Sequence, residues 1–146
     1  DRCAEAKAAP LADRDSDPEV ARRAIELRRT LILERHRAGA GLLLGADSPQ
    51  IFNVPGFSLH RELDALVAAG LTPYEALRTG TVAVAEFLGT STGIVAVGRD
   101  ADLVLLDANP LADIGNSRRI HGVVLRGTWY PAAALERRLE PYVAVE

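Results

Sequence analysis

Residues 41–47, with the sequence GLLLGAD, decide the fold of this chain. Three leucines between glycines are too few for a buried helix and lack polar alternation, so they predict a strand covered on both faces, as in parallel α/β sheets. The run ends on a carboxylate, Asp47. In barrels of alternating strands and helices, the C-terminal ends of the strands and the loops that follow them carry the chemistry. Asp47 is therefore the first candidate catalytic residue.

The segments on both sides of this strand have the pattern of helices. Pro18 follows a Ser-Asp pair that can cap a helix, which predicts a helix over residues 18–38. After the strand and its loop, Ser58 is placed to cap a second helix with one apolar stripe. Thr72 and Glu75 have the spacing of a capping box at the start of a third. The helix–strand–helix order indicates an α/β arrangement.

The pattern changes from helix to strand at Thr90. The stretches TGIVAVGRDADLVLLDANP and RRIHGVVLRGTWYP contain short β-branched runs between glycine and aspartate turns, which predicts a sheet of three or four strands. This segment has little with which to cover such a sheet, so its strands are expected to pair with strands from elsewhere. We divide the chain into a disordered or remnant N-terminal segment (1–16), a helix–strand–helix part (17–89) and a part with strands and a terminal helix (90–146).

The composition narrows the class of protein. Among 146 residues, 20 acids and 17 bases are mixed along the chain, giving a formal charge of −3 and no basic patch that would bind nucleic acid. No apolar run approaches the roughly 20 residues that span a bilayer, and no signal peptide is recognisable, so we expect a cytoplasmic protein without membrane contact. The single Cys3 permits no internal disulfide. The absence of methionine indicates that Asp1 is not the biological start and that N-terminal sequence is missing.

Four blocks of sequence occur here in an order that resembles one enzyme family. LLLGADSP, PGFSLHRELDALVAAGLTPYEALRTGT, GIVAVGRDADLVLLDANPLADI and VVLRG are similar to the C-terminal end of metal-dependent amidohydrolases, in the branch of imidazolonepropionases and Xaa-Pro dipeptidases. The resemblance covers residues 41–128. It implies that the chain is the C-terminal fragment of a (β/α)8 barrel, comprising the last strand and the following helices, together with the C-terminal strands of a small β-sandwich.

The resemblance also implies a reaction and a role for one acid. Metal-bound water attacks a carbonyl carbon, and a carboxylate at the end of strand eight contacts the metal, accepts the water's proton and delivers it to the leaving nitrogen. Asp47 matches that position, although Ala46 stands where relatives commonly have threonine. The substrate would be a small molecule with a cyclic amide, imidazolone-like or dipeptide-like C–N bond, and the divalent metal would be Zn²⁺.

The histidines do not complete such a metal site. The family's other ligands precede this region, whereas His36, His60 and His121 lack the His-x-His spacing and fall on different elements. We therefore expect this fragment alone to be inactive and to bind no metal tightly. His60, near the start of a helix after the loop, is a candidate for substrate binding, although it could equally cap or pack that helix. Glu62 and Asp64, two residues apart on that helix, are expected to diverge on a solvated face.

Two other interpretations remain open at this point. The chain could be a non-catalytic structural or interaction module, or a subunit completed by an N-terminal partner chain that supplies the missing barrel. It could also form a stand-alone α+β domain or a homo-oligomer that shares sheet edges, because exposed leucine-rich faces favour association.

Overall fold

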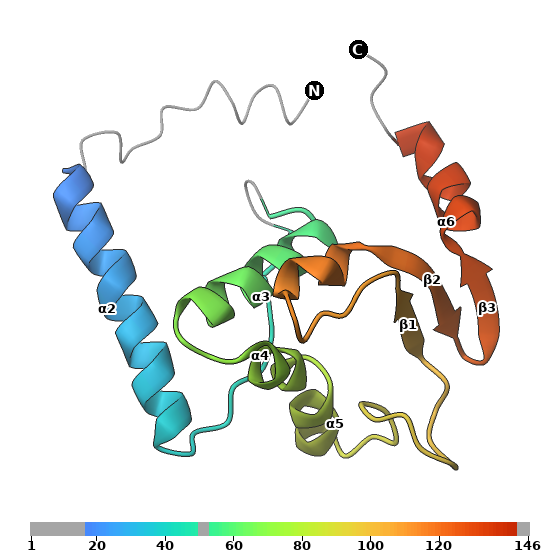
Figure 1. Ribbon diagram of the computed structural model, residues 1–146, viewed down its shortest axis with the longest axis horizontal. Helices are drawn as coiled ribbons and strands as arrows, with labels where there is room; N and C mark the ends of the chain where they lie inside the picture. Colours follow the sequence, from blue (N-terminus) through green and yellow to red (C-terminus); the bar gives the residue numbers. More distant parts are fainter. Residues whose placement is uncertain (1–16, 50–52, 143–146) are drawn as a thin grey trace.

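The computed structural model describes residues 17–49 and 53–142 as a mixed α/β structure. The predicted N-terminal segment 1–16, with Cys3, lies outside the described residues. Figure 1 shows α2 on one side, α3, α4 and α5 in the middle, and the sheet with α6 on the other side. The elements in chain order are α2 (Pro18–Arg37), α3 (Phe57–Ala68), α4 (Pro73–Thr79), α5 (Val82–Leu88), β1 (Leu103–Leu106), η1 (Ile114–Arg118), β2 (Ile120–Leu125), β3 (Thr128–Pro131), α6 (Ala132–Leu139) and η2 (Glu140–Tyr142).

Helix α2 confirms the prediction for residues 18–38. The Asp17 carboxylate accepts a hydrogen bond from the Glu19 amide at 2.9 Å, which satisfies one of the free N–H groups of the first turn. No side chain of α2 is fully buried, and only Ile32 and Leu33 pack against the core. The helix therefore touches the rest of the described structure through its C-terminal half.

Residues 41–47 are extended but form no strand, so the predicted strand covered on both faces is wrong for the described structure. Leu42 and Leu44 are half-buried, whereas Leu43 between them is 46% exposed. The physical reason is the lack of a neighbour: a strand needs a ladder partner, and within residues 17–49 and 53–142 the one sheet is formed by β1, β2 and β3. The Leu44 amide instead donates to the carbonyl of Thr79 at 3.0 Å.

The helices after this segment begin in two different ways. Helix α3 starts at Phe57 with Gly56 as its N-cap at φ 84° and no side-chain cap, so the prediction that Ser58 caps this helix is wrong. Ser58 is instead buried in the first turn. The predicted capping box of α4 is confirmed, because Thr72 and Glu75 each bond the other's backbone N–H.

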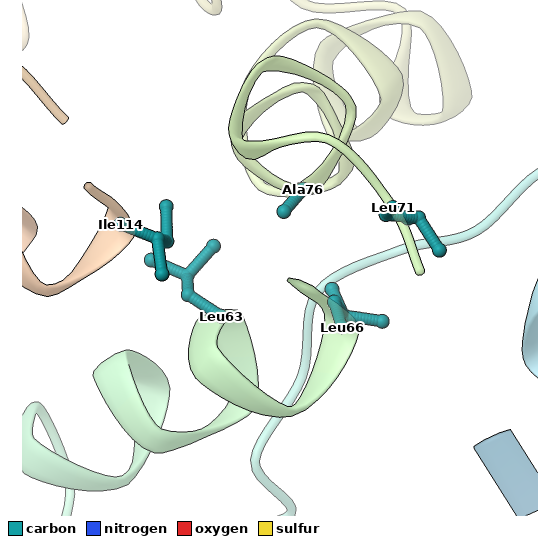
Figure 2. Packing of buried hydrophobic residues seen from close by; sticks show 5 residues of the cluster. All are labelled: Leu63, Leu66, Leu71, Ala76 and Ile114. Atoms are coloured by element: carbon teal, nitrogen blue, oxygen red, sulfur yellow. The ribbon is translucent and has the colours of Figure 1, made fainter. Parts of the chain in front are cut away.

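The core lies among α3, α4 and η1. Figure 2 shows its five side chains, which converge from α3, the α3–α4 connection, α4 and η1. They are Leu63, Leu66, Leu71, Ala76 and Ile114. Half-buried residues from α2 and from residues 41–47 pack against this cluster. The extended segment is thus held against the helices by its even-numbered side chains.

The C-terminal part forms an antiparallel sheet in the order β1-β2-β3. Strands β2 and β3 are joined by Arg126 and Gly127, which both have positive φ (50° and 77°), as a two-residue type I′ hairpin requires. The predicted small sheet is confirmed with three strands, but the apolar residues 94–97 belong to none of them. No helix within the described ranges is long and apolar enough to cross a membrane.

Candidate active site

An open pocket of about 300 Å³ lies where the extended segment ends against α3. One wall is the end of the segment, a second is the start of α3, and Asn53 comes from the connection between them. The lining residues are Gly45, Ala46, Asp47, Asn53, Ser58, Arg61 and Glu62. The first candidate from the sequence, Asp47, is therefore at a pocket.

Backbone contacts hold Asp47 at this pocket. The Leu44–Thr79 hydrogen bond ties the segment to the end of α4, and the missing side chain of Gly80 makes room for Leu44, since a Cβ there would lie 2.6 Å from Leu44 Cδ2. Closer to the site, the Asn53 side-chain amide donates to the carbonyl of Ala46 at 2.9 Å. These contacts hold the backbone just before the position from which the carboxylate projects.

Asp47 has a left-handed backbone conformation, with φ of 48°. Aspartate is among the few residues other than glycine that adopt this region readily, because its short side chain can bond locally. Such conformations are enriched at functional sites, where the surrounding structure maintains the strain. The turn redirects the chain immediately after the segment and leaves Asp47 exposed at the pocket.

The α3 wall carries charge of both signs. Ser58, Arg61 and Glu62 share one side of the helix because they are three and four residues apart. Glu62 is half-buried and lines the pocket, which corrects its assignment to a solvated face. The predicted divergence of Glu62 from Asp64 is confirmed, because Asp64 turns to η1 and pairs with Arg118. The pocket therefore combines two acids and one guanidinium.

His60 lies on a different side of α3 and is not among the residues that line the pocket. Its Nδ1 is 3.0 Å from the hydroxyl of the buried Ser117 on η1. Burial lowers the pKa of His60 below 6.5, and the positive charge of Arg118 lowers it further, against an opposing effect of Asp64. Residues two apart on a helix point about 200° apart, so the face that sends Glu62 to the pocket sends His60 to η1. A substrate contact for His60 stays a prediction, and the structure gives it a packing partner instead.

The other two histidines also contact residues that do not line the pocket. His36 pairs with Glu75 across α2 and α4, with Nε2 to Oε1 at 3.3 Å. His121 on β2 bonds Asp107 at 2.9 Å and lies beside Trp129. The structure does not bring these histidines together with Asp47 or with each other.

The donor set at the pocket fits a metal ion only in part. Asp47 offers a carboxylate of the kind that Zn²⁺ accepts. Within residues 17–49 and 53–142, however, no three or more His, Cys, Asp or Glu side chains are grouped as a metal site requires. The described residues therefore form no complete metal site, and further ligands would have to come from elsewhere.

Asn53 and Arg61 were not predicted at this site. A usable signal was present, because Arg61 lies three residues after Ser58 and so falls on the helix face that follows the loop. Asn53 could not have been found by spacing, since its bond to Ala46 joins residues seven positions apart outside any helix or strand.

The sequence of this chain matches the profile of a known protein family. The sequence profile described as "Amidohydrolase family" matches residues 5–130. The sequence matches none of the curated proteins with which it was compared.

Solved structures resemble the described part. A proposed prolidase from Bifidobacterium longum is 35% identical, with 77% of this chain and 30% of that protein covered and a TM-score of 0.62. Phenylurea hydrolase B is 27% identical over 78% of this chain and 28% of its own, with a TM-score of 0.57. Molinate hydrolase is 25% identical over 99% of this chain and 32% of its own, with a TM-score of 0.58. The chain therefore spans about a third or less of the length of these proteins.

Proposed function

Because the chain belongs to the amidohydrolase family, we propose that its residues form the C-terminal part of a hydrolase for C–N bonds other than standard peptide bonds. The substrate would be a small molecule with a cyclic amide, imidazolone-like or dipeptide-like bond. The similarity to a proposed prolidase and to phenylurea and molinate hydrolases supports hydrolysis as the type of reaction. We further propose that residues 41–47 form the last strand of a barrel completed by further chain, because this chain spans only 30% and 32% of the length of two of these proteins.

One observation carries this proposal: Asp47 ends the extended segment at the pocket, in a left-handed turn held by neighbouring backbone contacts. A carboxylate fixed at a pocket can serve as a general base when the proton it takes is within hydrogen-bond reach. The φ of Asp47 and the Asn53 bond to Ala46 limit how far the backbone that carries this carboxylate can move. Fixed geometry of this kind lowers the entropic cost of reaching the transition state.

In the proposed reaction, Asp47 moves one proton. The oxygen of a water attacks the carbonyl carbon while the Asp47 carboxylate accepts a proton from that water. The C–N bond then breaks, and Asp47 returns the proton to the departing nitrogen, which leaves a carboxylic acid and an amine. A divalent metal would lower the pKa of the attacking water. We propose that this metal is Zn²⁺ and that Asp47 is one of its ligands.

A second candidate is a subunit that is completed by an N-terminal partner chain. This is favoured by the donor set, because the described residues hold no complete group of metal ligands. In that case Asp47 would contribute to a site only within the complex. The two candidates predict the same role for Asp47 and differ in whether one chain or two carry the ligands.

The test is a comparison of the full-length protein with its Asp47→Asn variant. We expect purified full-length protein to contain a divalent metal and to hydrolyse members of a panel of dipeptides, cyclic amides and ureas, and we expect Asp47→Asn to lose that activity while folding normally. Activity that survives Asp47→Asn would contradict the proposal. Metal and activity that appear only when a second chain is added would favour the subunit instead.

A further inference from the structure

Helix α4 contacts the chain that leads to Asp47 at two points, which we call together the α4 brace. At the start of α4, Oε1 of Glu75 lies 3.3 Å from Nε2 of His36 in the last turn of α2. At the end of α4, the carbonyl of Thr79 accepts the hydrogen bond from the amide of Leu44, three residues before Asp47. The chain between α2 and the pocket is therefore attached to one helix at both of its ends.

The Glu75 carboxylate joins two helices through its two oxygens. Oε2 accepts hydrogen bonds from the backbone N–H and the hydroxyl of Thr72 at the start of α4, while Oε1 faces His36 on α2. The bonds from Thr72, followed by His36, lower the pKa of Glu75 to about 2, so its carboxylate is ionised at neutral pH. An ionised carboxylate only accepts hydrogen bonds, and the Nε2–H of His36 can donate to it from the neutral or the protonated ring.

The second contact of the α4 brace depends on the shape of the chain at Gly80. A Cβ at this residue would lie 2.6 Å from Cδ2 and 3.2 Å from Cβ of Leu44. The φ of Gly80 is −102°, outside the left-handed region that favours glycine, so alanine can adopt the same backbone. The missing side chain thus serves the approach of Leu44, and a methyl group there would displace Leu44 without straining the end of α4.

We propose that the α4 brace positions Asp47, with His36 and Glu75 as positioning residues that act through the chain of residues 38–44. The lining residues of the pocket come from the extended segment, the connection after it and α3, so α4 acts from outside the pocket. A base that is held in place before the reaction loses less freedom in the transition state, and the brace therefore contributes to kcat. This inference rests on the proposed function, because it concerns the position of the proposed base.

The first test changes the α2 end of the brace in the full-length enzyme. His36→Leu removes the N–H donor and leaves the capping box of Glu75 intact, whereas His36→Gln offers an amide N–H in place of Nε2–H. We expect His36→Leu to lower kcat by about two- to fivefold at unchanged KM, as suits a partly exposed ion pair, and His36→Gln to restore most of it. Arg37→Gln is the matched control, because Arg37 pairs with Glu34 within α2 and should leave kcat unchanged. Equal kcat values for wild type and His36→Leu, or no recovery in His36→Gln, would overturn the role of His36.

The second test changes the other end of the brace by shape alone. Gly80→Ala should lower kcat by about 10-fold, because a shift of about 1 Å in a catalytic group can cost about 100-fold. Gly41→Ala is the matched control, since a Cβ at residue 41 meets no atom of the described residues within 4 Å, and it should leave kcat unchanged. Full activity in Gly80→Ala would show that Leu44 does not determine the position of Asp47.

Hydrogen exchange measures the brace without turnover. Under native conditions, the peptide of residues 42–47 should exchange about two- to fivefold faster in His36→Leu and in Gly80→Ala than in the wild type, while the peptide of α3 around Leu63 stays protected. Faster exchange throughout the chain would mean global destabilisation and would contradict a positioning role.

The same measurements separate this inference from the proposed function. If Asp47→Asn abolishes hydrolysis but His36→Leu and Gly80→Ala change neither kcat nor the exchange of residues 42–47, only the α4 brace fails. If Asp47→Asn retains hydrolysis, the proposed function fails, and the exchange rates still decide whether α4 holds the segment in place.

Discussion

Two regions of the molecule bury different amounts of apolar surface: the helical region of α3 and α4, and the three-stranded sheet. The helical region with η1 supplies the core of Leu63, Leu66, Leu71, Ala76 and Ile114 (Figure 2). In the sheet, a glycine is the only fully buried residue, and several large apolar side chains are more than 40% exposed. These exposed side chains are Val104, Leu105, Leu125 and Trp129.

This difference shows which region can hold a site by itself. All the pocket residues belong to the extended segment, the loop after it or α3, which pack on the helical core. The sheet lies beside this region (Figure 1) and lines no part of the pocket. A well-packed region keeps side chains in fixed positions, whereas an open sheet depends on further cover.

The strongest test of this comparison is to remove one carboxylate from each region of the full-length enzyme. Asp47→Asn should lower kcat by about 10²- to 10⁴-fold, the usual contribution of a general base. Asp107→Asn, which removes the carboxylate charge beside His121 on the sheet, is the control and should leave kcat within about twofold, because Asp107 lies outside the pocket. Equal losses in steady-state assays would show that the sheet takes part in the site.

A second test compares one leucine from each region. Leu63→Ala should lower the free energy of unfolding by about 2–5 kcal/mol, because Leu63 is 5% exposed and its removal leaves a cavity. Leu105→Ala should cost no more than about 1 kcal/mol, because Leu105 is already 54% exposed. Urea unfolding measures both values. Similar losses for the two variants would mean that the sheet is covered in solution by something else.

A third test addresses the contact of α3 with η1, the segment that leads into β2. Arg118 on η1 contacts Asp64 on α3 through two nitrogen–oxygen pairs, at 3.2 Å and 2.5 Å. Both side chains are more than 40% exposed, so solvent screens the pair, and we expect a coupling free energy of about 0.2–1 kcal/mol from a double-mutant cycle with Arg118→Gln and Asp64→Asn. A coupling well above this range would show that η1 is held to α3 mainly by charge and not by Ile114.

The smallest expected effect is a pH dependence in the helical region. Hydrogen bonds from the Thr72 backbone and hydroxyl, followed by His36, lower the pKa of Glu75 from 4.5 to about 2. Because the pKa of Glu75 is lower in the folded than in the unfolded protein, the ionised carboxylate stabilises the fold above pH 4.5. This contribution is lost as the pH falls from 4.5 to about 2. Urea midpoints should therefore differ between wild type and Glu75→Gln near pH 6 and converge near pH 2.

The matched control for this pH series is Glu136→Gln on α6, outside the capping box. Its midpoint should follow that of the wild type over the same pH range. A difference between wild type and Glu75→Gln that persists unchanged at pH 2 would contradict the assigned role of the Glu75 carboxylate.

Local signals predicted most of the elements correctly because their causes lie within a few residues. Three features depend on neighbours in sequence: the capping box of Thr72 and Glu75, the bounds of α2, and the glycine turn between β2 and β3. The position of Asp47 at a pocket also followed from the sequence, because an acid after an apolar run sits at the end of the element.

Several features that the sequence did not predict depend on distant neighbours. Residues 41–47 need a paired strand that the described part lacks, and they form an extended segment instead. The contact of His60 with Ser117 joins residues 57 positions apart, so no local pattern could have assigned His60 to η1. Residues 94–97 also have the composition of a strand, but they pair with no strand of the described sheet and are exposed.

The backbone turn at Asp47 restricts which substitutions give a clear answer at this position. With φ at 48°, alanine would remove the carboxylate and also strain the main chain, so a loss of activity in an alanine variant would have two causes. Asparagine tolerates the same conformation and changes only the charge. Glutamate would both strain the turn and move the carboxylate to a different position. In a saturation library, folded variants at residue 47 should therefore be enriched in Asp, Asn and Gly, and activity should then select Asp from among them.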